Sequence, residues 1–367
     1  MAPVLRALSH TKGVESIVCT TGQHRFMLEQ VLTLFDIRAD HDLDVMVEGQ
    51  TLNGLSARIL ERLDPVLDHV RPQRVLVHGD TSTAMAAALA AFHRKIPVGH
   101  VEAGLRTGSL AEPWPEEFNR RMVDVIGDHL FAPTEQARDN LLAERLSGQI
   151  HVTGNTVIDA LQVVADQLDQ HPALREQIDG RLPRLAPDAR MVLVTSHRRE
   201  NFGKGLEGIC EALLAIARHA DAEVVYPVHL NPQVRVPVER MLGGVPRIHL
   251  IAPQDYLGFV RLMQRASVVL TDSGGVQEEA PSLGKPVLVM RDVTERPEAV
   301  RAGTVRLVGT HAETIRSQVA LLLDDEGEYQ RMARCTNPYG DGRASERIVA
   351  ALCGRPVEPF VDRSGSD

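Results

Sequence analysis

In this 367-residue chain, two carboxylate side chains directly follow strand-like segments, and a third stands at the start of a helical pattern farther along the sequence. Asp80 comes just after the apolar run 75–78, and Glu102 comes just after a second run that ends at Val101. Glu116 follows a loop that is bounded by prolines. Carboxylates gathered at one rim could remove or return a proton on carbon, or stabilise an oxocarbenium-like sugar centre.

Each of these carboxylates also has a structural interpretation. Asp80 stands where a helix N-cap is expected, and by itself that reading is the commoner one. Glu102 and Arg106 could form a structural ion pair at the same rim. Glu116 and Arg120 lie four residues apart, which is typical of a solvated salt bridge on one helix face. A third carboxylate at the rim weakens the purely structural explanation.

A glycine turn marks a second group of residues. The segment 271–290 predicts a strand, a turn at Gly274 and Gly275, a helix, and then another strand. The bare amides of these glycines and the positive helix end suit a phosphate. Glu279, farther along the helix, could accept hydrogen bonds from a ribose diol. The alternative is an ordinary turn in which Ser273 is the N-cap.

Basic side chains cluster at other strand ends in this half of the chain. His197, Arg198 and Arg199 follow one apolar run, His229 follows another, and Arg296 comes after the strand at 287–290. Cationic side chains at a helix start oppose the helix dipole, a penalty that a bound diphosphate would remove. Carboxylates in the first half and an anion site in the second together suit a nucleotide diphosphate-sugar.

Apolar, β-rich runs alternate with helical patterns along the whole chain, which predicts an α/β protein with parallel sheets. Strands are expected at 15–20, 74–78, 98–101, 129–132, 149–152, 191–195, 223–228, 248–251, 268–271 and 287–290. Helices are expected at 52–70, 82–93, 116–126 and 134–144. A polar, proline-bearing break at 162–188 separates two halves. We therefore expect two Rossmann-like domains facing a central cleft, with ligand at the carboxyl ends of their strands.

The composition excludes several classes of protein. Lys and Arg number 40 against 49 acidic residues, so the net charge is −9, and a nucleic-acid surface is not expected. The 4 cysteines are far apart and contain no CxxC, so neither a zinc site nor a disulfide framework is indicated. We expect no metal, no signal peptide, no membrane span and a cytoplasmic protein.

Eight motifs, in order, resemble those of the non-hydrolysing UDP-N-acetylglucosamine (UDP-GlcNAc) 2-epimerases. They are His78-Gly-Asp-Thr, His100-Val-Glu-Ala-Gly-Leu-Arg-Thr, Pro113-Trp-Pro-Glu-Glu-Phe-Asn-Arg, Thr153-Gly-Asn-Thr-Val-Ile-Asp-Ala, His197-Arg-Arg-Glu-Asn, Tyr226-Pro-Val-His-Leu-Asn-Pro, Thr271-Asp-Ser-Gly-Gly-Val-Gln-Glu-Glu and Asn337-Pro-Tyr-Gly-Asp-Gly. The resemblance covers residues 1 to about 352. It implies a glycosyltransferase-B-like fold, a homodimer, and interconversion of UDP-GlcNAc and UDP-ManNAc without nicotinamide or any other cofactor. The ManNAc unit would serve cell-surface polysaccharide synthesis.

The resemblance also implies a mechanism and roles for residues. UDP is eliminated with the C2 proton to give 2-acetamidoglucal, and it then adds back while C2 takes a proton on the opposite face. Catalytic positions are matched by Asp80, Glu102, Glu116, Arg120 and His197, and UDP-binding positions by Ser273, Gly274, Gly275, Glu279 and Arg296. Asp80 and Glu116 are expected to move protons, and Glu102 to stabilise the cationic sugar.

The implied domains are 1–162 for the sugar and 163–340 for UDP, with a helix in 341–362 that packs back on the first domain and a disordered tail at 363–367. Some relatives have a second, allosteric nucleotide-sugar site, which Gln23, Arg198 and His229 match. Phe26 and Gly49 stand where those relatives carry a polar and a basic residue, so activation by substrate is not expected here.

The beginning of the chain departs from the family pattern. The first strand and a Gly-Thr-Arg-Pro-Glu turn are expected before the helix that contains Met1-Ala-Pro-Val-Leu. Our hypothesis is a misplaced start codon or a truncated gene model. Two other functions stay open: a hydrolysing epimerase or a related nucleotide-sugar glycosyltransferase, and an inactive protein that only binds nucleotide sugar.

Overall fold

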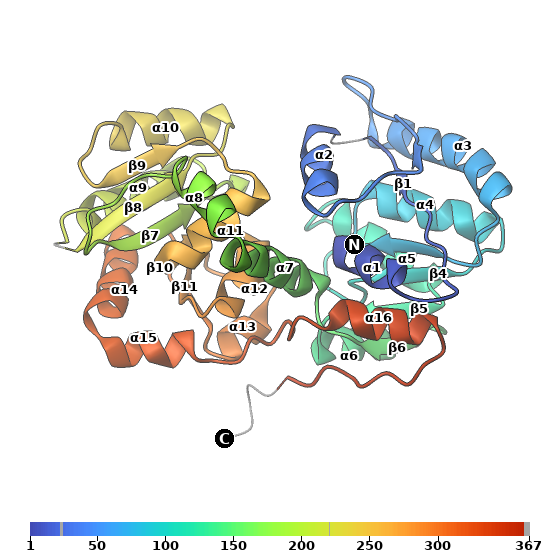
Figure 1. Cartoon of the computed structure of the whole chain (residues 1–367). Helices are drawn as coiled ribbons and strands as arrows, with labels where there is room; N and C mark the ends of the chain where they lie inside the picture. Colours follow the sequence, from blue (N-terminus) through green and yellow to red (C-terminus); the bar gives the residue numbers. More distant parts are fainter. Residues whose placement is uncertain (23–24, 220, 363–367) are drawn as a thin grey trace. The chain divides into compact units, whose positions relative to one another are not determined.

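Two separate parallel sheets form the framework of the protein, each in its own unit of the computed structural model (Figure 1). Residues 1–22, 25–219 and 221–362 are described. Unit 1 combines Met1–Ala160 with Tyr339–Asp362, and Leu161–Pro338 belong to unit 2. Gln23 and the tail 363–367 lie outside the described residues.

Unit 1 is built on a four-stranded sheet whose order is β3-β4-β5-β6. Its strands are β3 (Val75–His78), β4 (Val98–Val101), β5 (His129–Ala132) and β6 (Gln149–Val152). A separate pair joins β1 (Cys19–Thr20) to β2 (His41–Asp42) in parallel. The strand expected at 15–20 is therefore much shorter than predicted.

The helices of unit 1 come from both ends of the chain. They are α1 (Ala2–Ser9), α2 (Arg25–Leu34), α3 (Leu52–Val70), α4 (Ser82–His93), α5 (Glu116–Ile126), α6 (Glu135–Ala143) and α16 (Ala344–Leu352). Helices α1 and α16 lie beside each other (Figure 1). Val4 and Leu8 of α1 share a buried cluster with Ile348 and Val349 of α16. The C-terminal helix thus completes the core of unit 1.

Unit 2 is built on a six-stranded parallel sheet whose order is β12-β11-β10-β7-β8-β9. Its strands are β7 (Arg190–Thr195), β8 (Ala222–Pro227), β9 (Ile248–Ile251), β10 (Ala266–Thr271), β11 (Val287–Val289) and β12 (Val305–Leu307). The sequence did not predict β12. The central strands β7 and β10 are near-continuous apolar runs, as is typical of a sheet covered by helices on both faces.

Helices fill the connections of unit 2. They are α8 (Pro172–Asp179), the single turn η1 (Arg199–Asn201), α9 (Lys204–Ile216), α10 (Pro232–Leu242), α11 (Tyr256–Arg265), α12 (Gly274–Ser282), α13 (Pro297–Arg301), α14 (Ala312–Asp324) and α15 (Glu326–Ala333). The predicted break at 162–188 is largely helical, because α7 (Thr156–Gln170) crosses the division at Ala160 and α8 follows it.

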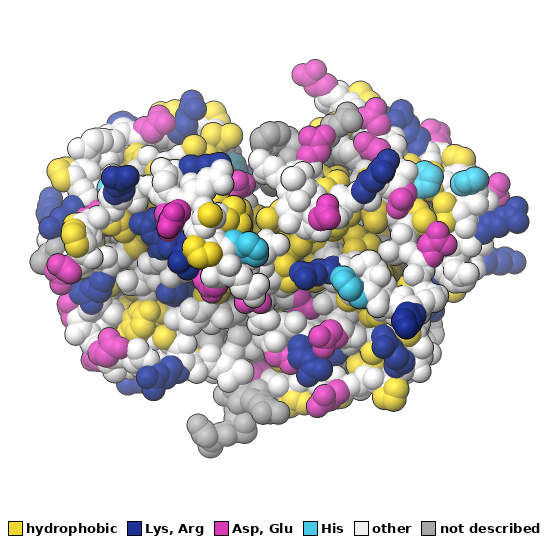
Figure 2. All heavy atoms as spheres, in the orientation of Figure 1, with side chains coloured by type: hydrophobic (Ala, Val, Ile, Leu, Met, Phe, Trp, Pro, Cys, Tyr) yellow, Lys and Arg dark blue, Asp and Glu magenta, His cyan; other side chains and the backbone are white. Residues whose placement is uncertain are grey.

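Parallel strands bring their carboxyl ends to one edge of a sheet. In unit 1 this edge carries Asp80 and Glu102, and in unit 2 it carries His197 and the start of α12. On the face drawn in Figure 2, acidic and basic side chains are interspersed. Within the part of the chain that the structure describes, no helix combines the length and apolar character that a membrane span requires.

Candidate functional site

Asp80 is not the cap of the helix that follows β3. The N-cap of α4 is Thr81, whose hydroxyl accepts a hydrogen bond from the Ala84 amide at 3.1 Å. The structural interpretation of Asp80 is therefore wrong. Its carboxylate instead accepts from Arg120 Nε at 3.1 Å and from Nη2 of the same guanidinium. Asn119 donates to the Asp80 carbonyl at 2.9 Å, so both the backbone and the side chain of Asp80 are held.

Glu102 follows β4 in a left-handed backbone conformation, with φ of 70°, which is uncommon for a residue with a side chain. Asn155 Nδ2 donates to its Oε1 at 3.2 Å. His78 Nε2 lies 3.6 Å from its Oε2. The second carboxylate of the rim is thus aimed by its backbone and by a buried amide.

Glu116 is the first residue of α5, and its Oε2 is buried without a hydrogen-bond partner. The expected pair with Arg120 is wrong, because Arg120 binds Asp80 and, at 3.3 Å, Glu117. Leaving a buried carboxylate oxygen unpaired costs free energy that a ligand's donor would recover. This oxygen could therefore accept a proton or a hydrogen bond from a bound ligand.

Three supporting residues of unit 1 were not singled out from the sequence. Glu117, Asn119 and Asn155 are all buried polar side chains. They lie inside motifs of the resemblance, next to the residues that were chosen. A single sequence does not show that a polar side chain is buried and hydrogen-bonded to a site residue, so these three could not be found from it.

The structural ion pair considered for Arg106 and Glu102 is not the one that Arg106 forms. Arg106 Nη1 lies 2.7 Å from Asp124 Oδ2, and its other nitrogens bind Glu144 at 2.8 and 2.7 Å. Arg106 thus links the buried Asp124 to the exposed Glu144.

In unit 2 the start of α12 has the features of an anion site. Ser273 occupies the N-cap position but makes no side-chain capping bond, so the simple capping interpretation does not hold. A Cβ at Gly274 would lie 2.5 Å from Arg296 Nη1, which means that the guanidinium rests directly on this glycine. The positive end of helix α12 and the Arg296 guanidinium therefore lie next to each other, where both could bind one anion.

Three arginines converge on one carboxylate beside this helix end. Glu295 is 2.8 Å from Arg296, 2.6 Å from Arg291 and 3.1 Å from Arg198. Burial alone would raise the pKa of Glu295, but Arg296 and Arg291 lower it to about 2. These guanidinium groups are therefore ordered around an anionic side chain.

His197 is held by a fully buried aspartate at the end of β10. Asp272 accepts from the backbone amides of His197 and Arg198, each at 3.0 Å, and lies 3.4 Å from His197 Nδ1. The His229 ring stacks on the His197 ring with a centroid distance of 5.7 Å. Burial, more than any charge, lowers the pKa of His197, which favours the neutral ring at pH 7.

Glu279 lies on α12, where it is 7% exposed and accepts a hydrogen bond from Tyr256 Oη at 2.7 Å. Burial raises its pKa to about 7, although the Tyr256 bond opposes this. An acceptor of this kind suits a pair of ribose hydroxyls. Tyr256 was not predicted as part of the site, because it is 23 residues away in sequence.

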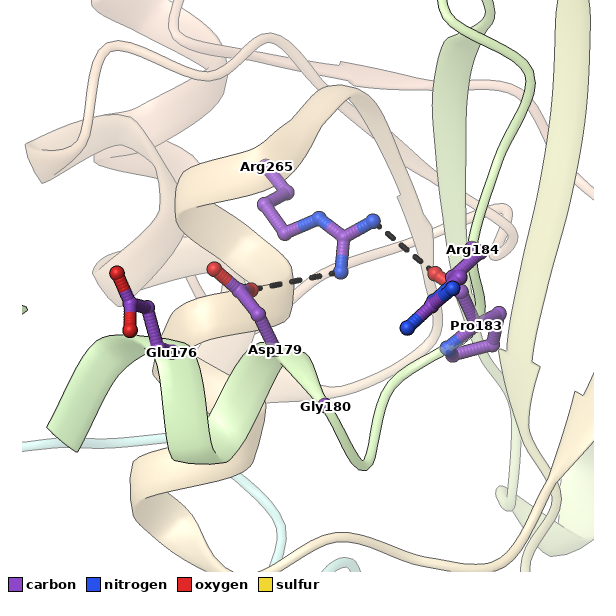
Figure 3. A pocket seen from close by; sticks show the side chains of 6 residues that line it. All are labelled: Glu176, Asp179, Gly180, Pro183, Arg184 and Arg265. Atoms are coloured by element: carbon purple, nitrogen blue, oxygen red, sulfur yellow. Dashed lines mark hydrogen bonds and ion pairs between the residues drawn. The ribbon is translucent and has the colours of Figure 1, made fainter. Parts of the chain in front are cut away.

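A separate cavity of about 440 Å³ in unit 2 contains none of the predicted residues. It lies beside the ends of α8 and α11, just before β7 and β10 begin, and therefore at the opposite edge of the sheet. Figure 3 shows Arg265 between Asp179, at 3.6 Å, and the Pro183 carbonyl, at 3.1 Å. Arg265 thus binds two of the groups that line the cavity.

Of the predicted second site, Arg198 and His229 adjoin His197 in unit 2, whereas Gln23 and the side chain of Phe26 are outside the described residues. Among the residues that are described, no three His, Cys, Asp or Glu side chains are grouped to hold a metal ion.

Carboxylates at the rim of unit 1 and arginines around a helix start in unit 2 are the features that the sequence predicted for a nucleotide-sugar protein. The family model described as UDP-N-acetylglucosamine 2-epimerase matches residues 6–353, and the chain belongs to this family.

Similar proteins include the UDP-N-acetylglucosamine 2-epimerase of Escherichia coli O157:H7, which is 57% identical over 354 residues, 96% of this chain and 94% of that protein. The crystal structure of UDP-GlcNAc 2-epimerase from Neisseria meningitidis bound to UDP-GlcNAc is similar with a TM-score of 0.90 and 49% identity, over 97% of this chain and 96% of that one. The structure of S. aureus MnaA with UDP is similar with a TM-score of 0.85 and 42% identity, over 99% of this chain and 95% of that one.

Proposed function

We propose that this protein interconverts UDP-GlcNAc and UDP-ManNAc by elimination and re-addition of UDP. Family membership supports the substrate, since the related Neisseria meningitidis structure is described as bound to UDP-GlcNAc. The single observation that carries the chemistry is the group of carboxylates at the rim of unit 1, each in a different environment. Asp80 is paired with Arg120, Glu102 is held by Asn155, and Glu116 has an unpaired buried oxygen.

The carboxylates of unit 1 act on the sugar. In the first stage a carboxylate takes the C2 hydrogen as a proton, the C1–O bond breaks, and UDP leaves with the bonding electrons. A C1–C2 double bond forms, which gives 2-acetamidoglucal. In the second stage a UDP oxygen attacks C1, and C2 receives a proton on the opposite face. Asp80 and Glu116 move the protons in this proposal, and Glu102 stabilises the positive charge that develops at C1.

Unit 2 binds UDP. The amides of Gly274 and Gly275, together with Arg296, hold the diphosphate, and the neutral His197 ring stabilises its charge as it departs. Ser273 supplies a hydroxyl that no capping bond occupies, and Glu279 accepts from the ribose. The close contact between the Arg296 guanidinium and Gly274 supports this arrangement. Arg198 and His229 are proposed to serve a second nucleotide-sugar site beside His197.

Product analysis distinguishes this function from the alternatives. Purified protein is incubated with UDP-GlcNAc, and the sugars are identified by proton NMR. The proposal expects UDP-ManNAc in a fixed ratio with UDP-GlcNAc. Free ManNAc with UDP would indicate a hydrolysing epimerase, and transfer that requires an added acceptor would indicate a glycosyltransferase. Binding without any product would indicate a nucleotide-sugar-binding protein.

We further propose a cytoplasmic homodimer whose ManNAc units enter cell-surface polysaccharide. Four free cysteines are compatible with a reducing compartment. Exposed apolar side chains on α4 and α5, among them Phe92, Phe118 and Val125, support burial against a second copy. Light scattering is expected to give twice the chain mass of 40.3 kDa. The polysaccharide role is supported by the family resemblance alone.

A further inference from the structure

A buried histidine lies directly behind the carboxylates of unit 1. His100 on β4 is fully buried, and both of its ring nitrogens have partners. Nδ1 is 2.6 Å from Asp124 Oδ1 on α5, and Nε2 is 3.0 Å from the Gly79 carbonyl oxygen. A carbonyl and a carboxylate can only accept hydrogen bonds. Both ring nitrogens of His100 therefore face acceptor oxygens, an arrangement that a ring with a proton on each nitrogen satisfies in full.

The surrounding charges fit this protonation state. The other oxygen of Asp124 is 2.7 Å from Arg106 Nη1 and 3.3 Å from the Gly104 amide. Arg106 is in turn bound by Glu144 through two nitrogens. His100, Asp124, Arg106 and Glu144 thus form a chain of paired groups that runs from the buried His100 to the exposed Glu144, and pairing is what makes buried polar groups tolerable.

The Gly79 carbonyl belongs to the peptide that joins Gly79 to Asp80. His100 fixes this carbonyl, and the Val101 carbonyl accepts from the Gly79 amide at 3.0 Å. The backbone that leads into Asp80 is therefore held on both sides. A rotation of this peptide would move the Asp80 carboxylate relative to Arg120.

Glu102 depends on the same peptide. It lies two residues after His100, and a Cβ placed on Gly79 would be 3.2 Å from Glu102 Oε2. The Glu102 carboxylate therefore packs against Gly79. One buried histidine thus supports the loops that carry two of the three carboxylates.

We propose that His100, held by Asp124, is a positioning residue that sets Asp80 and Glu102 for the reaction. It does not touch the substrate, and it acts through the Gly79–Asp80 peptide. This inference rests on the proposed function, and it gives His100 and Asp124 a role in that function.

The test uses His100→Asn and Asp124→Asn in the full-length chain. Misplacing reacting groups by about 1 Å can cost roughly a hundredfold in rate. We expect kcat for C2 hydrogen exchange to fall between roughly tenfold and a hundredfold, with little change in KM, because UDP binding lies in unit 2. His129→Asn is the matched control: His129 is also buried, but it lies at the first residue of β5, at the opposite edge of the sheet. It is expected to lower the melting temperature and leave kcat unchanged.

Wild-type kcat in folded His100→Asn protein would overturn the proposal, as would an equal loss of kcat in His129→Asn. Nitrogen NMR of histidine-labelled wild-type protein tests it independently of the variants' folding. The ring of His100 is expected to carry protons on both nitrogens, and a single protonated nitrogen would refute the argument. If wild-type protein shows no exchange at all, the proposed function fails, whereas the NMR result still decides whether His100 has the inferred state.

Discussion

Replacing Glu279 by glutamine should make unit 2 more stable at pH 8 while it weakens UDP binding. Burial raises the pKa of this carboxyl from 4.5 to about 7. Between these values the folded protein binds a proton that the unfolded chain has released. Stability therefore falls as the pH rises from about 4.5 to about 7, and it stays low above that range.

The size of the effect follows from the same pKa values. One pKa step corresponds to about 1.4 kcal/mol, so the raised pKa of Glu279 lowers the stability by about 3 kcal/mol at pH 8 and by about 1 kcal/mol at pH 5. Glutamine has no such dependence and keeps an oxygen that accepts from Tyr256. Its amide N–H groups bring a burial cost of about 1 kcal/mol. The variant should gain about 2 kcal/mol at pH 8 and almost nothing at pH 5.

The assay is urea-dependent hydrogen exchange of the β10 amides, which reports the unfolding free energy of unit 2 by itself. Glu278→Gln is the control, because Glu278 accepts from Arg296 Nε at 2.6 Å and its replacement should destabilise the protein. Calorimetry should show weaker UDP binding by Glu279→Gln. A stability difference between wild type and Glu279→Gln that is the same at pH 5 and pH 8 would refute the reasoning.

Three further changes probe other parts of the site. Asp80→Asn should abolish C2 exchange followed by NMR, yet leave the calorimetric Kd for UDP unchanged; a large change in Kd would contradict separate roles for the two units. Thr81→Ala should cost about 1 kcal/mol in urea denaturation, since the Ala84 amide loses its acceptor; unchanged stability would show that the cap is dispensable. Gly274→Ala should weaken UDP binding by displacing Arg296, because the new Cβ would lie 2.5 Å from its guanidinium; wild-type affinity would argue against an anion site at this helix start.

Much of the fold could be predicted where local signals were strong. The helices at 52–70, 82–93 and 116–126 have the bounds that the sequence predicted. The first two begin after threonine caps, Thr51 and Thr81, whose hydroxyls accept from backbone amides. Short edge elements were missed, because β2 and β12 have only 2 and 3 residues and leave no periodic pattern to detect.

The site could be predicted only in part, for a similar reason. Motifs placed the carboxylates and the glycine turn, but not their partners. Arg120 was paired with Glu116 from helix spacing, whereas its partner Asp80 is 40 residues away. Likewise, the bond between Asn155 and Glu102 spans 53 residues. Contacts of this kind depend on how strands and helices are packed, which spacing along one chain does not reveal.

The central claim is that C2 loses its proton and regains one on either face. The most direct measurement is an incubation with UDP-GlcNAc in D2O, followed by proton NMR of the recovered nucleotide sugars. The account predicts deuterium at C2, accompanied by UDP-ManNAc. Formation of UDP-ManNAc that retains its C2 proton, or no exchange and no epimer at all, would contradict it.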